Sequence, residues 1–146
     1  MSAPDRGFEF TDEVTSDLCY RASGRTLADL FAAAADGLLA ITLENPEAVE
    51  PRERLTLELE EPDRELLLLR FLSELVYLRD ARGLLLRAEE VEVDAGPPAR
   101  LSARLAGERF DPKRHRPGSE VKAITAHALE IRETPRGYEA RITPDL

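Results

Sequence analysis

Cysteine is nearly absent from this sequence. Its 146 residues include one cysteine, Cys19, which excludes an internal disulfide framework and a multi-cysteine zinc site. No apolar run approaches the roughly 18 residues that span a membrane, and the start of the chain carries no apolar signal core. The length predicts one domain over 1–146, large enough to bury a core without a disulfide or a structural metal. These features predict a cytoplasmic protein with no membrane partner.

Several motifs that carry chemistry are also missing. The 8 glycines form neither a GxGxxG nor a GxxxxGK[ST] loop, and no HExxH, CxxC or GxSxG occurs. The two histidines do not have the spacing of paired metal ligands. We expect His115 in a solvated polar loop, and His127 among the core side chains on the apolar face of a strand. The neighbours of Cys19 give no clear reason for a reactive thiolate.

Charge is unevenly distributed along the chain, whose net charge is −9. Residues 1–100 contain 11 basic and 22 acidic side chains, whereas the remainder contains 9 basic and 7 acidic ones. Such an acidic chain is a poor candidate for gripping a nucleic acid backbone alone. A role with RNA would therefore run through a protein partner. The local exception is the basic run 113–116, followed by Lys122.

The apolar pattern predicts an α+β fold. Thr26 and Asp63 are N-cap candidates for two helices, which end at Asn45-Pro46 and at Gly83. The order is ββαβα followed by about four strands, which indicates a two-layer sandwich with two helices packed on mostly antiparallel sheet. Strands are predicted at 8–10, 17–22, 55–60, 84–94, 101–105, 121–132 and 138–142, and a surface loop is predicted at 107–118.

Oxygen ligands are the remaining possibility for a metal site. Acidic residues gather near the start, including Asp17, and Asp145 stands near the other end. Carboxylates suit a hard cation such as Ca²⁺ or Mg²⁺, although solvated surface carboxylates are the alternative in a chain with 29 acidic residues. Lys122 is one of only two lysines, and a solvent-facing strand lysine is its alternative interpretation.

Two stretches together resemble the archease family over essentially the whole chain. Residues 13–27 (EVTSDLCYRASGRTL) resemble its signature E-H-T-A-D-I-x-x-R-A-x-G-x-T-L, with Val14 in place of the usual histidine. Asp111, Arg114-His115 and residues 120–127 (EVKAITAH) resemble D-x-x-R-H…E-V-K-A-x-T-x-H, and Asp145-Leu146 resembles the closing Asp-Val.

The resemblance implies an accessory protein without catalysis of its own. Archeases are protein cofactors of RtcB-type RNA ligases in tRNA splicing and RNA repair, where they promote ligase guanylylation and multiple turnover. The resemblance therefore implies that the protein contacts RNA only indirectly, through the ligase. The family's metal position, typically assigned to Ca²⁺ with Mg²⁺ or Mn²⁺ possible, maps to Asp17 and Asp145, with main-chain oxygen from Leu146. Lys122 matches a lysine needed for activation of the partner.

Two other function classes stay open. A small metal-dependent phosphate-ester hydrolase would use Asp17 and Asp145, although no general base with a histidine partner is evident. A non-catalytic acidic interaction module would leave both carboxylates solvated. In the ligase activator and in the hydrolase alike, Asp17 and Asp145 would lie close together. Two close carboxylates raise each other's pKa unless a cation lies between them.

Overall fold

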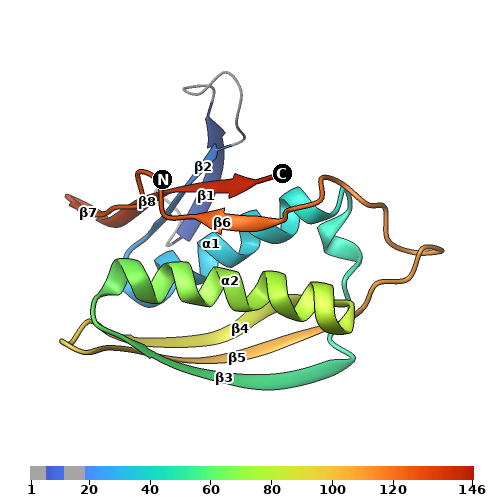
Figure 1. The fold of residues 1–146 in the computed structure, drawn as a ribbon, viewed down its shortest axis with the longest axis horizontal. Helices are drawn as coiled ribbons and strands as arrows, with labels where there is room; N and C mark the ends of the chain where they lie inside the picture. Colours follow the sequence, from blue (N-terminus) through green and yellow to red (C-terminus); the bar gives the residue numbers. More distant parts are fainter. Residues whose placement is uncertain (1–5, 12–18) are drawn as a thin grey trace.

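The computed structural model describes residues 6–11 and 19–146, and within them the order of elements is ββαβα followed by five strands (Figure 1). The elements are β1 (Arg6–Thr11), β2 (Cys19–Gly24), α1 (Leu27–Thr42), the short 3₁₀ helix η1 (Pro46–Ala48), β3 (Glu53–Glu61), α2 (Arg64–Arg82), β4 (Leu84–Asp94), β5 (Ala99–Arg109), β6 (Ala123–Thr125), β7 (Ile131–Thr134) and β8 (Gly137–Asp145).

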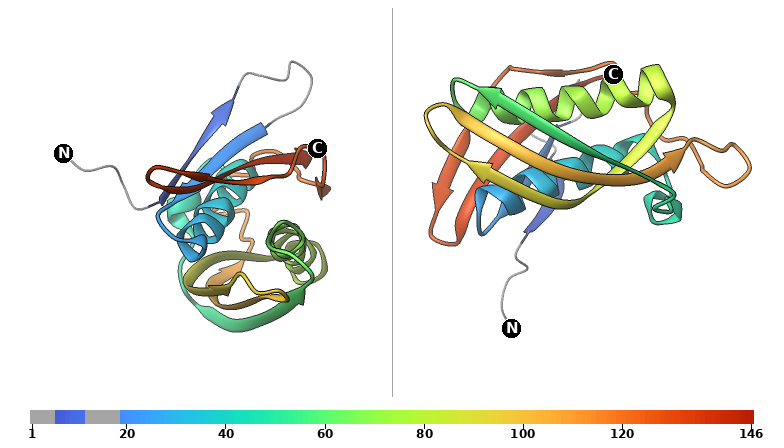
Figure 2. Two further views of the ribbon diagram at one scale, coloured as in Figure 1. Left: turned by 90° about the vertical axis from the view of Figure 1, so that its left-hand side faces the viewer. Right: turned by 90° about the horizontal axis from the view of Figure 1, so that it is seen from below.

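The strands form two antiparallel sheets with the two helices between them (Figure 2). One sheet has the order β3-β5-β4. The other has the order β1-β2-β8, and both β6 and β7 pair with the far side of β8. The predicted α+β class, with two helices on mostly antiparallel sheet, is confirmed. The strands divide into two sheets, so the helices lie between two sheets and the two-layer arrangement becomes three layers. Neither described helix combines the length and apolar character needed to cross a bilayer.

Helix α1 is buried on most of its surface because it is covered by both sheets. The Thr26 hydroxyl accepts a hydrogen bond from the Asp29 N–H at 3.0 Å, as the capping pattern predicts. Its small residues allow β2 to approach closely: the buried Tyr20 hydroxyl donates to the Ala34 carbonyl at 2.7 Å. At Gly37 a Cβ atom would lie 2.4 Å from the Tyr20 ring, so only glycine fits there. This contact seats the helix on the sheet that carries the candidate site.

Helix α2 begins and ends where the sequence predicts. The Asp63 carboxylate accepts from the Leu66 N–H at 2.8 Å, and Gly83 ends the helix in the left-handed region at φ +67°. Phe71 stacks on Phe31 of α1, with 6.1 Å between the ring centroids. The core therefore lies between the helices and the inner faces of both sheets.

The long strand predicted at 121–132 is wrong, because the segment pairs with β8 in two registers. Ala123 pairs with Asp145, whereas Ile131 pairs with Ala140. From Ala123 to Ile131 the segment advances eight positions, whereas its partner β8 changes by only five, from Asp145 to Ala140. The extra residues leave the ladder and form a turn. His127 lies in that turn and is exposed, which corrects the expectation of a core histidine.

Candidate functional site

The end of the β6–β8 pairing forms an exposed tip, defined here by Lys122, Asp145 and Leu146. The Lys122 N–H donates to the Asp145 carbonyl at 2.7 Å, and Ala123 pairs with Asp145. Lys122 and Asp145 are exposed, and Leu146 is 46% exposed. Three of the residues singled out in the sequence are therefore neighbours in the fold.

Asp17, the fourth of these residues, lies outside the described residues. The nearest described part of that segment is Cys19, whose Sγ atom lies 3.6 Å from the Thr143 hydroxyl on β8. The last pair of the β2–β8 ladder is Tyr20 with Ile142, three residues from Asp17 on one strand and three residues from Asp145 on the other.

The donor chemistry of the tip fits a hard cation. The Asp145 carboxylate and the main-chain oxygen of Leu146 are oxygen ligands of the kind that Ca²⁺ and Mg²⁺ take. Within residues 6–11 and 19–146, no three histidine, cysteine, aspartate or glutamate side chains are grouped closely enough to hold a metal. A cation at this tip would therefore need further oxygen ligands, from Asp17 and from water.

The basic run 113–116 does not form a continuous surface patch. Lys113 and Arg116 are exposed, but the His115 side chain is fully buried, which corrects the expectation that it is solvated. Arg114 turns toward β5 and donates to both carboxylate oxygens of the buried Glu108, at 2.5 and 2.9 Å. The residues between β5 and β6 are thereby fastened to the β3-β5-β4 sheet.

Glu108 is the centre of this buried cluster. Its carboxylate also accepts from the Glu50 N–H at 2.6 Å and lies 3.2 Å from His115 Nε2. The Asp111 N–H donates to His115 Nδ1 at 2.8 Å, so the hydrogen of a neutral imidazole is on Nε2 and points at Glu108. Hydrogen bonding from Arg114, opposed by burial, lowers the pKa of Glu108 from 4.5 to about 2. The same bond raises the pKa of Arg114.

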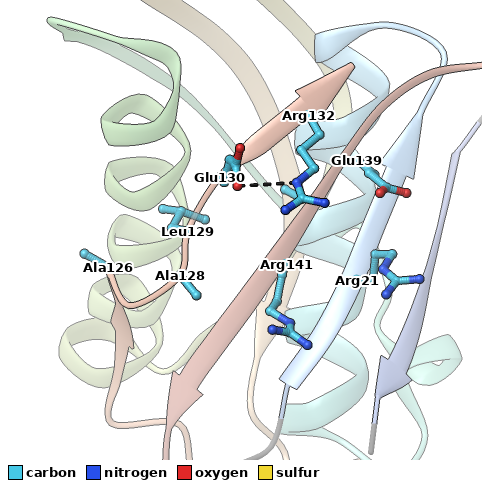
Figure 3. Close-up of a pocket in the computed structure, with 9 residues that line it drawn as sticks. Arg21, Ala126, Ala128, Leu129, Glu130, Arg132, Glu139 and Arg141 are labelled. Atoms are coloured by element: carbon cyan, nitrogen blue, oxygen red, sulfur yellow. Dashed lines mark hydrogen bonds and ion pairs between the residues drawn. The ribbon is translucent and has the colours of Figure 1, made fainter. Parts of the chain in front are cut away.

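A third feature, which the sequence did not reveal, is a pocket of about 560 Å³ on the outer face of the five-stranded sheet (Figure 3). Three arginines line it: Arg21 on β2, Arg132 on β7 and Arg141 on β8. Arg21 and Arg141 pair directly across the β2–β8 ladder. Since 120 positions separate them in the chain, no local sequence pattern could have brought them together.

Comparisons with known proteins agree on one family. The chain matches the Archease protein family (MTH1598/TM1083) over residues 8–146. It is 40% identical over 136 residues to protein archease of Thermococcus kodakarensis, covering 92% of this chain and 95% of that protein. Protein archease of Pyrobaculum calidifontis is likewise 40% identical over 136 residues, covering 92% of each chain.

Solved structures extend the comparison to the fold. The solution structure of protein 1598 from Methanobacterium thermoautotrophicum is 32% identical and gives a TM-score of 0.81, covering 96% of this chain and 99% of that one. A crystal structure from Thermotoga maritima, described as an archease and possible chaperone, shares the fold at a TM-score of 0.64 and 18% identity, covering 100% and 98%. The chain therefore belongs to the Archease family.

Proposed function

We propose that this protein is a non-catalytic activator of an RtcB-type RNA ligase, promoting ligase guanylylation and multiple turnover in tRNA splicing or RNA repair. Family membership supports this proposal. The observation that carries it is the hydrogen bond between the Lys122 N–H and the Asp145 carbonyl. It puts two residues of separate family motifs side by side at an exposed tip, where another protein can reach them.

The proposed cofactor is a divalent cation held at this tip by Asp17, Asp145 and the main-chain oxygen of Leu146. Ca²⁺ is the first candidate, with Mg²⁺ or Mn²⁺ as alternatives. Cys19, two positions after Asp17 in the sequence, has its Sγ atom 3.6 Å from the hydroxyl of Thr143, two positions before Asp145. When bound, such an ion would stabilise negative charge on the phosphates of the ligase-bound nucleotide.

Lys122 would supply a positive charge near these carboxylates. Its backbone is held on both sides, since the Arg79 guanidinium donates to the carbonyl of the buried Val121 and Asp145 accepts from Lys122 itself. A lysine ammonium is a compact charge with three donors, suited to a phosphate or to a carboxylate of the partner. The net charge of −9 would also favour encounter with a basic, RNA-binding ligase.

The test is multiple-turnover RNA ligation by an RtcB-type ligase with GTP and divalent metal, with and without this protein. We expect wild type to raise turnover and guanylylation, and Lys122→Gln and Asp145→Asn to reduce that stimulation about tenfold, corresponding to about 1.4 kcal/mol. Matched controls are Lys113→Gln, which removes the other lysine, and Glu92→Gln, which removes an exposed carboxylate on β4. Both should remain within about twofold of wild type.

Calorimetric metal titration gives a readout independent of the ligase. The double variant Asp17→Ala, Asp145→Ala should lose divalent-metal binding and remain folded. If that variant stimulates the ligase fully, the metal-bearing tip is wrong. If wild type fails to stimulate a competent ligase, the activator function is wrong. EDTA-sensitive hydrolysis of phosphate esters by the isolated protein would instead indicate a hydrolase.

A further inference from the structure

The arginine pocket has the dimensions of a ligand site. Its volume of about 560 Å³ falls within the range of roughly 300–1,000 Å³ typical of small-molecule sites. Arg21, Arg132 and Arg141 come from three neighbouring strands, and Figure 3 shows their side chains on the same side of the sheet. None of these arginines belongs to the tip proposed to meet the ligase.

The pairing of β2 with β8 places two of these arginines directly opposite each other. Arg21 pairs directly with Arg141, and Arg132 pairs with Glu139 one row away. Directly opposed side chains have Cβ atoms about 4.5–5.5 Å apart, and like charges in that arrangement destabilise a ladder. Two guanidiniums opposed in this way can donate together to one anion.

The ion pairs described at the pocket are exposed. Arg132 Nε donates to Glu130 at 3.3 Å, and Arg21 donates to Glu9 at 3.1 Å. The side chains of Arg132 and Glu130 are 68% and 62% exposed, and exposed pairs of this kind are weak. A guanidinium carries five donors, so it can contact a carboxylate and a second anion at once. The lining contains three arginines and two glutamates, Glu130 and Glu139, so its net charge is +1 in a chain of −9. The Glu9 carboxylate that Arg21 contacts lies outside this lining.

The surplus turn between β6 and β7 forms the remaining wall of the pocket. Ala126, Ala128 and Leu129 line it with apolar surface. Ala128 has φ +56°, a left-handed conformation that is unfavourable for alanine. Strained backbone of this kind is concentrated at ligand sites. The wall therefore offers apolar contact beside the arginines, as a sugar or a base attached to a phosphate would need.

We propose that this pocket is a phosphate-binding site, in which Arg21, Arg132 and Arg141 contact the phosphate of a free nucleotide or of an RNA strand. Guanidiniums from three strands suit a phosphate with several acceptor oxygens better than they suit a planar carboxylate with two. Arg141 precedes Asp145 by four residues on β8, which is about 13 Å along a strand. The site would therefore give the protein its own contact with a nucleotide or RNA, beyond the contact through a ligase.

The test follows amide shifts of the isotope-labelled protein in EDTA at low salt, with AMP and a short single-stranded RNA as probes. EDTA removes divalent cations, so failure of this proposal is distinguishable from failure of the metal-bearing tip. We expect shifts in residues 126–130 and in β7 and β8. Arg141→Gln should weaken binding about tenfold. The logarithm of the RNA association constant should fall linearly with the logarithm of the salt concentration, with a slope of about −0.7 for each phosphate neutralised.

The matched control is Arg104→Gln. Arg104 is an exposed arginine on β5 that pairs with Glu90 at 2.9 Å, far from the pocket in the other sheet. It should bind both probes within about twofold of wild type. Arg132→Gln is a second pocket variant at a more exposed position, and it covers the case in which Arg141→Gln fails to fold.

The outcomes separate the two phosphate sources. Equal affinity for both probes supports a nucleotide site, and much tighter RNA binding supports a strand site. The absence of shifts at these residues with either probe overturns the proposal, as does an equal loss in Arg104→Gln. Loss of ligase association in Arg141→Gln, with neither probe bound by wild type, would make the pocket a protein contact and overturn it as well.

Discussion

The molecule contains two contrasting groups of arginine and glutamate side chains, one buried and one exposed. At the β3-β5-β4 sheet the Glu108 side chain is 5% exposed, and both of its oxygens accept hydrogen bonds from Arg114. At the outer face of the five-stranded sheet the carboxylate of Glu130 is 62% exposed and makes one long contact with Arg132. The residue types are the same, but the burial and the number of hydrogen bonds differ.

Burial and hydrogen bonding decide how much a charged pair contributes to the stability of the fold. A buried carboxylate with every oxygen occupied is costly to disturb, because removing one partner leaves uncompensated charge or polar groups. An exposed pair contributes little and exchanges readily with water or an anion.

Glu108→Ala should lower the free energy of unfolding by about 3–5 kcal/mol, because Arg114 and His115 lose their buried partner. Urea denaturation followed by circular dichroism measures the change. The control Glu130→Ala removes an exposed carboxylate and should stay within about 0.5 kcal/mol of wild type. Similar losses in both variants would contradict the contrast between the two groups.

Lowering the pH should reduce the free energy of unfolding as the buried Glu108 carboxylate becomes protonated. Because its pKa is lowered from 4.5 to about 2 in the folded protein, its contribution is fully present above the unfolded value. It is lost as pH falls from 4.5 toward 2. Urea denaturation of wild type and Glu108→Gln at about pH 6 and about pH 3 should show the stability gap shrinking in acid. If the difference in unfolding free energy between wild type and Glu108→Gln does not change with pH, Glu108 stabilises the fold by packing and not by its charge.

Arg132→Gln should change the free energy of unfolding by less than about 0.5 kcal/mol, since its ion pair is exposed. In about 1 M NaCl, where the screening length is about 3 Å, the difference in stability between wild type and Arg132→Gln should be equally small. Thermal unfolding monitored by circular dichroism detects both changes. A loss above about 1 kcal/mol would show that the exposed group supports the fold after all.

Local chemistry determined what could be predicted from the sequence. The caps at Thr26, Asp63 and Gly83 were recognisable because each depends on residues within one helical turn. The strand predicted at 84–94 agrees with β4, since its boundaries are set by Gly83 and by the turn at Gly96. These features need no knowledge of the rest of the fold.

Long-range pairing determined what could not be predicted. His115 looked solvated because its neighbours in sequence are polar, whereas its environment is set by Glu108 and by the loop closing over it. The break in 121–132 follows from the register of β8, and the arginine pocket follows from the pairing of β2 with β8. For the tip, family resemblance identified Lys122 and Asp145 before their contact was known.

Strand β8 also has a consequence for the timing of assembly. The β3, β4 and β5 segments are close in sequence and can pair early during synthesis. The partner of β2, by contrast, leaves the ribosome more than 110 residues after β2 itself. Arg141 and Asp145 both lie on β8. A nascent chain would therefore have its helices and one sheet before it had either the tip or the pocket, so both would appear together with the last strand.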